Sequence, residues 1–383
     1  MKTHSEAQLA KRVPLARRAL LGAALACSGV ATGITAPATT EPIPSLREAA
    51  ARADLLFGSD SDIDIRSAPE AYSDLFVRHC NLLAPQLSWS TVAPQRYGAD
   101  PAREDPNIAF ARAHGLRLTG AHLLWHENLP AWFSQLQSPA DAVEAMQRHI
   151  LSMTDRYGAM TYTWNVVNEA IEPKDRRSDG LRRTPLLQLL GPDYIELAFH
   201  TAREAMPNAV LIYNDYGFEP NFPGYQKRRA ALLRLLDHWR AAQVPIDAVG
   251  LQSHLILDGA RFDAESYRSF LREIADRGLA IVISELDVLD LAPATDIAAI
   301  DAGVAARYSE FLTTALDEPA VVALVTWGLS DRYTWLTQRR DRHFARWDGL
   351  PNRPLPFDAS YQPKPVFYAI LSALQHAPPR RPL

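Results

Sequence analysis

This sequence has few cysteines and no excess of positive charge, and each of these features excludes a class of protein. Only two of the 383 residues are cysteines, Cys27 and Cys80, so neither a disulfide framework nor a thiolate zinc site is expected. The 40 Lys and Arg residues are outnumbered by 44 Asp and Glu residues, for a formal net charge of -4 at pH 7. Because binding to a phosphate backbone depends on basic surfaces, we expect no nucleic-acid partner.

Sequence motifs for common cofactors are missing as well. The glycine combinations of Walker and dinucleotide-binding loops do not occur. His122 and His126 have the i, i+4 spacing of helical zinc sites, but their segment is predicted to end a strand, where this spacing does not place two side chains on one helix face. We therefore expect no metal and no cofactor.

Residues 1–38 have the pattern of a signal peptide. The basic stretch 11–18 precedes the apolar run 19–26, and small residues follow as far as Ala38. The pair Arg17-Arg18 fits the twin-arginine type, which carries folded proteins across the bacterial inner membrane. An N-terminal membrane anchor is the alternative, although the run is short for a span of about 20 residues. We expect an exported protein, periplasmic or secreted, with no membrane association after signal removal.

Short runs rich in Val, Ile and Leu alternate along the rest of the chain with stretches such as 226–236, which have the apolar spacing of amphipathic helices. Each gap between runs is long enough for a helix that crosses over to the next parallel strand. Eight such units predict an α/β protein with a single (β/α)8 TIM barrel, as one domain over residues 45–376. The eight runs lie near 55–57, 81–83, 116–125, 162–167, 210–213, 246–251, 280–283 and 321–327.

Two glutamates follow apolar runs at the positions where a barrel places its chemistry, the carboxyl ends of the strands. Glu169 closes the fourth run and Glu285 the seventh, each among other polar residues. Strands four and seven face each other across the mouth of a closed barrel, so these carboxyl groups are expected to flank one substrate bond. One acid to protonate the leaving oxygen and one carboxylate to attack the anomeric carbon, or to activate water, are what glycoside hydrolysis requires.

The segments around these glutamates, WNVVNEA at 164–170 and ISELDV at 283–288, resemble the signatures of glycoside hydrolase family 10. That family consists largely of endo-β-1,4-xylanases, and the resemblance extends from about Leu55 to Leu374. Further stretches that are similar to the family lie at 124–126, 130–132, 213–216, 250–254, 327–335, 357–358 and 363–365.

The resemblance implies a role for each matching residue. Glu169 corresponds to the general acid/base and Glu285 to the nucleophile of a retaining double displacement. Asn168 is expected to bind the sugar 2-hydroxyl next to the anomeric carbon. His254, with Asp287 behind it, is expected to orient the nucleophile and keep it ionised. Other residues that the resemblance assigns to substrate binding or orientation are Gln252, Trp125, Trp327 and Trp335, whereas Trp132 and Trp164 are expected to pack in the protein interior.

Several positions depart from the family pattern on the glycone side of the scissile bond. The Glu, Asn and Lys that hold a distal sugar after strand two are missing from 84–88, and the sugar-binding histidine after strand three falls on Ala121. His122 can replace it only if the strand bulges, because a shift of one residue turns a side chain to the other face. Further departures fall at Asn165, Gly217 and Leu336.

Three functions remain open on this basis. The first is a secreted, monomeric, retaining endo-1,4-β-xylanase that acts on xylan or xylo-oligosaccharides. The second is a β-glycosidase of the same barrel family that acts on a short or different β-glycoside. The third is a weakly active carbohydrate-binding barrel, which the retention of Glu169, Glu285, Asn168, His254 and Asp287 together disfavours.

Overall fold

The computed structural model describes residues 43–61, 63–85, 87–96, 106–120, 122–257, 262–291, 296–338, 344 and 346–380. The predicted signal peptide with its twin-arginine pair and Cys27 lies outside these residues, as do Gln86 and Ala121. Pro44–Leu383 forms one compact unit that holds every helix and strand described below.

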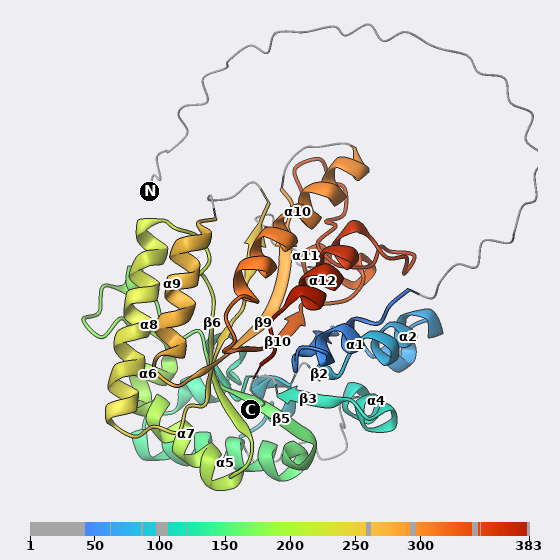
Figure 1. Ribbon diagram of the computed structural model, residues 1–383. Helices are drawn as coiled ribbons and strands as arrows, with labels where there is room; N and C mark the ends of the chain where they lie inside the picture. Colours follow the sequence, from blue (N-terminus) through green and yellow to red (C-terminus); the bar gives the residue numbers. More distant parts are fainter. Residues whose placement is uncertain are drawn as a thin grey trace, which may run out of the picture. The chain divides into compact units, whose positions relative to one another are not determined.

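A closed parallel barrel occupies the centre of this unit (Figure 1). Its strands follow the order β10-β1-β2-β3-β5-β6-β7-β9, and the pairing of β9 with β10 closes the circle. Two short strands extend the mouth, since β4 pairs with β5 and β8 with β9. The predicted (β/α)8 fold is therefore confirmed. The strands are β1 (Leu56–Asp60), β2 (Leu82–Ala84), β3 (Arg117–Gly120), β4 (Leu124–Trp125), β5 (Thr161–Asn168), β6 (Val210–Asp215), β7 (Ala248–Leu251), β8 (His254–Ile256), β9 (Ala280–Leu289) and β10 (Val321–Thr326).

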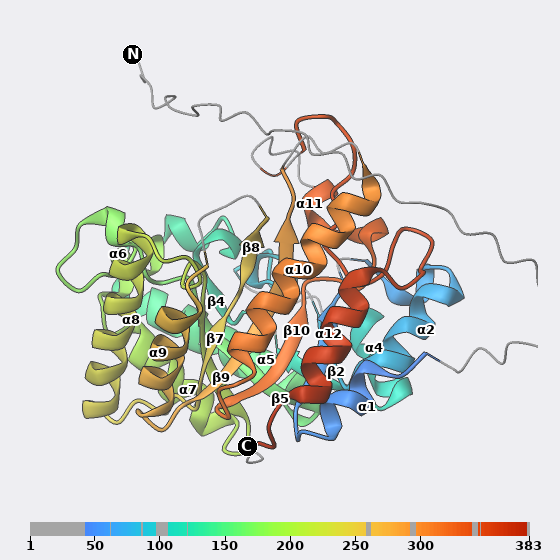
Figure 2. The ribbon, with the colours of Figure 1, turned by 45° about the horizontal axis from the view of Figure 1, so that its top comes forward.

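Helices surround the barrel on the outside (Figure 2). The predicted amphipathic stretch 226–236 lies in α8, where Leu232 and Leu236 are buried. Helix α5 begins where the side chain of Ser138 accepts a hydrogen bond from the Asp141 amide, with Pro139 in its first turn. The helices are α1 (Leu46–Ala51), α2 (Glu70–His79), α3 (Trp89–Val92), α4 (Pro106–His114), α5 (Pro139–Tyr157), α6 (Pro185–Leu190), α7 (Tyr194–Ala205), α8 (Pro223–Ala241), α9 (Ala264–Ala275), α10 (Ile297–Ala315), α11 (Trp335–Gln338) and α12 (Pro365–His376).

The interior of the barrel is a packed core and not a channel. Inward-facing side chains of β2, β6, β7, β9 and β10 form one apolar cluster, with Ile212, Val282 and Val325 among its members. Because these layers fill the interior, a ligand site can form only at an end of the barrel.

One irregularity in the strands changes which side chains face the mouth. Gly120 of β3 pairs with Trp164, and Leu124 of β4 pairs with Val167 of the same neighbouring strand. Gly120 and Leu124 are four residues apart along the chain, whereas their partners Trp164 and Val167 are three residues apart. The span from Gly120 to Leu124 therefore holds one residue more than the span of β5 that it faces, a local bulge that offsets the register shift between Leu118 and Thr119, where β5 has the extra residue.

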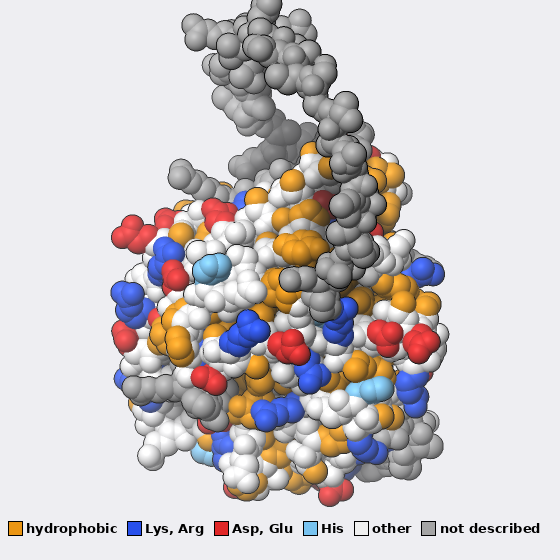
Figure 3. All heavy atoms as spheres, turned by 45° about the vertical axis from the view of Figure 1, so that its right-hand side comes forward, with side chains coloured by type: hydrophobic (Ala, Val, Ile, Leu, Met, Phe, Trp, Pro, Cys, Tyr) orange, Lys and Arg blue, Asp and Glu red, His pale blue; other side chains and the backbone are white. Residues whose placement is uncertain are grey.

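The surface carries charges of both signs on the face that Figure 3 shows, where basic and acidic side chains alternate around apolar patches. This mixture agrees with the small net charge. Among the described residues, the structure contains no helix with both the length and the hydropathy needed to cross a bilayer.

Candidate active site

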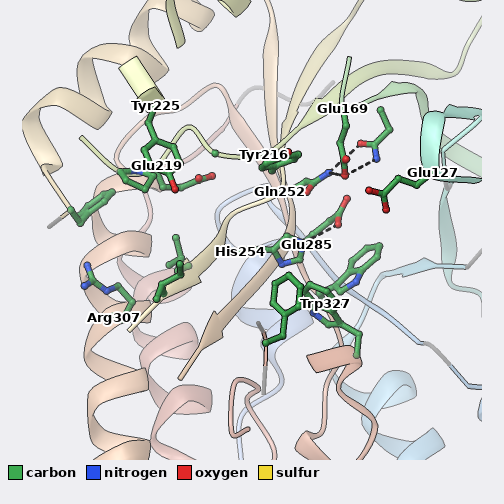
Figure 4. A pocket seen from close by; sticks show the side chains of 18 of the residues that line it. Glu127, Glu169, Tyr216, Glu219, Tyr225, Gln252, His254, Glu285, Arg307 and Trp327 are labelled. Carbon is green, nitrogen blue, oxygen red and sulfur yellow. Dashed lines mark hydrogen bonds and ion pairs between the residues drawn. The ribbon is translucent and has the colours of Figure 1, made fainter. Parts of the chain in front are cut away.

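A pocket of about 800 Å³ opens at the carboxyl ends of the strands (Figure 4). Eight of the nine residues assigned to the site from sequence line it, and the ninth, Asp287, is fully buried directly behind His254. The eight lining residues are Trp125, Asn168, Glu169, Gln252, His254, Glu285, Trp327 and Trp335.

Glu169 follows the last residue of β5 and has a left-handed backbone, with φ of 57°. Such a conformation costs about 1–2 kcal/mol in a residue with a side chain, and strain of this kind collects at functional sites. The Glu169 carboxyl group accepts hydrogen bonds from Gln252 at 3.0 Å and from Asn168 at 3.3 Å. Burial raises the pKa of Glu169 despite the bond from Gln252, and the nearby charges of Asp215 and Glu285 add to this effect. The protonated form is therefore favoured.

The surroundings of Glu285 shift its pKa in the direction opposite to that of Glu169. Its Oε1 accepts from the Asn214 side chain at 2.8 Å and lies 3.4 Å from Nε2 of His122. Its Oε2 lies 3.2 Å from Nε2 of His254. Burial alone would raise the pKa of Glu285, but the hydrogen bonds and charges of the two histidines outweigh it and lower the pKa to about 2. This group is a carboxylate at neutral pH.

His254 connects Glu285 to a buried acceptor. Its Nδ1 lies 2.9 Å from Asp287, and the other oxygen of Asp287 accepts from the indole N–H of Trp335 at 2.6 Å. Burial would lower the pKa of His254, yet the charge and hydrogen bond of Asp287, together with Glu285, raise it to about 10. The imidazole is thus a cation held between two carboxylates.

Three amide side chains join the two glutamates. Asn214 bonds to Glu285 and also donates to Oδ1 of Asn168 at 2.9 Å. Gln252 donates to the same oxygen of Asn168 at 3.2 Å as well as to Glu169. The sequence analysis quoted Asn214 within a motif but assigned it no role. Its place at the carboxyl end of β6 is the signal that identifies it.

His122 is the second residue for which sequence reasoning gave no definite role. The extra residue between β3 and β4 turns it toward the pocket, where it contacts Glu285. The i, i+4 spacing of His122 and His126 was not expected to form a metal site, because their segment was predicted to end a strand.

Among the tryptophans assigned a place from sequence, Trp125, Trp327 and Trp335 line the pocket, whereas Trp132, which was expected in the interior, is half-buried. Trp327 and Trp335 pack around His254, with ring centroids 6.3 Å and 5.1 Å from the imidazole. Trp125 lines the opposite wall and packs against His122. Trp164 is fully buried in β5, and Trp132 donates its indole N–H to the backbone of Ala93, outside this pocket.

Comparison with known proteins agrees with this geometry. Residues 45–373 match the family described as Glycosyl hydrolase family 10. The chain belongs to glycosyl hydrolase family 10. It is 32% identical to an endo-1,4-beta-xylanase of Geobacillus stearothermophilus, over 86% of this chain and 98% of that protein. It is 30% identical to endo-1,4-beta-xylanase B of Thermotoga neapolitana, over 86% and 91%. The solved structure of xylanase 10B from Thermotoga petrophila in complex with xylobiose superimposes with a TM-score of 0.77 at 28% identity and covers 87% of this chain and 98% of its own.

Within this family 10 barrel, the described residues that line the pocket begin at His122, so no described residue of the segments after β1 and β2 is among them. Ala84 is buried at the end of β2, and Ser88 caps α3. The departures at Asn165 and Leu336 are buried side chains, whereas Gly217 lines the pocket with φ of 75°.

One group of side chains at the family 10 site has the composition of a metal site. Ligand atoms of His126, Glu127 and Glu169 all lie within 4.8 Å of one another. From sequence, His126 was paired only with His122, and this set of three residues was not predicted.

Proposed function

We propose that this chain is an exported, retaining endo-1,4-β-xylanase that hydrolyses internal β-1,4-xylosidic bonds of xylan or xylo-oligosaccharides by double displacement. One observation carries the proposal: two buried glutamates of one pocket have pKa values shifted in opposite directions, Glu169 upward and Glu285 downward. A protonated acid and an ionised nucleophile are needed at the same pH, and paired carboxyl groups with diverging environments supply them.

In the first step, a carboxylate oxygen of Glu285 forms a bond to the anomeric carbon while the bond from that carbon to the glycosidic oxygen breaks. Glu169 gives its proton to that oxygen, and the aglycone leaves as an alcohol. In the second step, Glu169, now a carboxylate, takes a proton from a water molecule that attacks the anomeric carbon. The bond to Glu285 breaks, and the sugar leaves with its configuration retained.

The neighbours of Glu285 support this chemistry by position and charge. His254 and Asn214 contact different oxygens of Glu285 and so fix the plane of its carboxylate. Asn168 is placed beside Glu169 to hold the 2-hydroxyl of the sugar, an interaction that strengthens as positive charge develops on the ring.

Action on a short or different β-glycoside is the second candidate, and one specific observation supports it. The pocket takes no lining residue from the described segments after β1 and β2, where the family pattern places contacts to a distal sugar. Each missing hydrogen bond to a distal sugar is worth about 0.5–1.5 kcal/mol. A polymer would then be bound mainly on the aglycone side, through residues such as Tyr216 and Tyr225.

Product analysis of the mature protein with xylan, a xylo-oligosaccharide ladder and aryl β-glycosides distinguishes these candidates. Internal cleavage of xylan supports the first, and cleavage of short substrates alone supports the second. Inverted product in proton NMR spectra at early times would exclude double displacement. Binding to xylan without turnover of any substrate would leave the third candidate, a carbohydrate-binding barrel.

Export and a monomeric state belong to the same proposal. The support for export is the signal-peptide pattern of residues 1–38. Replacement of Arg17 and Arg18 by lysine should retain the full-length precursor in the cytoplasm of a host with a twin-arginine pathway. Sedimentation of the mature protein tests the oligomeric state.

A further inference from the structure

A histidine and two glutamates converge at the edge of the pocket from two neighbouring strands. His126 and Glu127 follow β4 in a short 3-10 turn, and Glu169 follows β5, with which β4 pairs. The potential ligand atoms of the three side chains lie within 4.8 Å of one another. Figure 4 shows the carboxylate of Glu127 directed toward those of Glu169 and Glu285, from the wall opposite Tyr216.

A second observation concerns the imidazole. Nδ1 of His126 is buried and has no hydrogen-bond partner among the described residues. A buried ring nitrogen without a partner is uncommon, because a polar atom that loses water without gaining a bond costs free energy.

The donor set indicates which cation fits. One imidazole nitrogen and two carboxylate oxygens suit zinc or a similar first-row divalent ion, whereas calcium and magnesium prefer oxygen ligands alone. Three protein ligands leave a fourth position open to water. We propose that His126, Glu127 and Glu169 form a binding site for Zn²⁺ that inhibits the enzyme.

The geometry requires only a small adjustment. Bonds from zinc to nitrogen and oxygen ligands are about 2.0–2.2 Å long, so the three ligand atoms must approach more closely than they do without the ion. Glu127 is exposed and lies on a short 3-10 turn, so we expect its side chain to make most of this adjustment and to give up its present interaction. Glu169 is held in place by Gln252 and Asn168.

Inhibition follows from the proton balance and rests on the proposed function. When zinc binds, Glu169 releases its proton to solvent and gives an oxygen lone pair to the metal. No proton is then available at Glu169 for the leaving oxygen, so the glycosidic bond is not cleaved. Removal of zinc by a chelator restores the carboxylic acid and the activity.

The test uses isothermal titration calorimetry with Zn²⁺ on the metal-free mature protein, together with xylanase assays of the same samples at increasing zinc. We expect one zinc ion per chain in the parent protein, and an affinity lower by at least tenfold in both Glu127→Gln and His126→Gln. The zinc concentration that halves activity, compared with each protein's own zinc-free rate, should rise by the same factor. Glu144→Gln, which removes an exposed carboxylate of α5, is the matched control and should behave like the parent.

The possible outcomes distinguish the zinc site, its inhibitory role and the proposed function from one another. Absence of zinc binding in the parent, or equal affinity in the parent and both variants with circular dichroism unchanged, would overturn the zinc site. Zinc binding that the two substitutions weaken, in a protein without activity on any β-glycoside, would leave the site standing and remove the proposed function. Zinc binding at the site without loss of activity in an active enzyme would overturn the inhibitory role.

Discussion

Asn214 occupies the space that a side chain on Gly250 would need. The two residues are direct partners in the pairing of β6 and β7, and a Cβ atom built on Gly250 would lie 2.1 Å from Oδ1 of Asn214. Asn214 must therefore leave its place in a Gly250→Ala variant, and with it the hydrogen bond to Glu285. Because hydrogen bonds to charged groups are worth about 1.5–3 kcal/mol, we expect kcat to fall roughly 10- to 100-fold.

Gly158→Ala is the control for this prediction, since a Cβ atom there makes only an ordinary contact of 3.6 Å with Met206. Its steady-state kinetics should equal those of the parent. If Asn214→Ala and Gly250→Ala disturb the same bond, the double variant should be little worse than either alone. Full activity of Gly250→Ala would show that Asn214 contributes nothing to turnover.

Replacement of His254 by glutamine should move the acidic limb of the pH profile. The positive imidazole helps keep the pKa of Glu285 at about 2, so its loss raises that pKa. Opposite charges at this distance shift a pKa by about 1–3 units. The acidic limb of kcat/KM should therefore move up by a comparable amount, while the basic limb, set by the raised pKa of Glu169, stays in place. An unchanged acidic limb would contradict the assignment of His254 as the group that positions and ionises Glu285.

The same histidine should make stability depend on pH. The pKa of His254 rises from 6.5 to about 10 in the folded protein, so its stabilising contribution is complete below about pH 6.5 and is lost as the pH rises through about 10. The free energy of unfolding in urea should fall between pH 7 and pH 10 by more in the parent than in His254→Gln. Parallel curves for the two proteins would mean that the imidazole titrates alike in the folded and unfolded chain.

Trp335→Phe separates the ring packing of that side chain from its hydrogen bond to Asp287. Phenylalanine keeps an aromatic ring beside His254 but removes the N–H that bonds to Asp287. We expect kcat to fall about tenfold, the value of one hydrogen bond to a charged group, with a smaller change in KM. Trp132→Phe also removes an indole donor, but one that bonds to the backbone of Ala93, and should leave kcat unchanged. A rise in KM alone would mean that Trp335 only binds the sugar.

Lys364 should matter for stability and not for catalysis. Its ammonium group is buried at the start of α12 and lies 2.8 Å from Asp331 and 3.3 Å from Asp301. Lys364→Met removes the buried partner of Asp331, whose remaining cation Arg353 lies 4.0 Å away, while Asp301 keeps its ion pair with Arg353. The free energy of unfolding should fall by about 3 kcal/mol. Lys227→Met, on the exposed face of α8, should change it by less than about 0.5 kcal/mol. Similar losses in the two variants would show that the buried pairs do not stabilise the closing helix.

The fold and the place of Glu169 and Glu285 in one pocket could be predicted because both depend on local pattern. Apolar runs separated by helical stretches place all eight barrel strands, and the position of Glu169 and Glu285 at strand ends singles them out. Asn214 was overlooked because its contact with Glu285 depends on a glycine in the neighbouring strand. Glu127 was overlooked because only the pairing of β4 with β5 brings its turn next to Glu169.

The extra residue between Gly120 and Leu124 bears on how homologous chains should be compared. An alignment without gaps, anchored on Trp125, pairs the sugar-binding histidine of the family pattern with Ala121. The histidine is then counted as lost from this chain. In space, His122 reaches Glu285. Two local register shifts of opposite sense can thus change which residue faces the mouth of a barrel, while both ends of the stretch keep their pairing. Substitution counts along such a strand overstate how far the chain has diverged in chemistry.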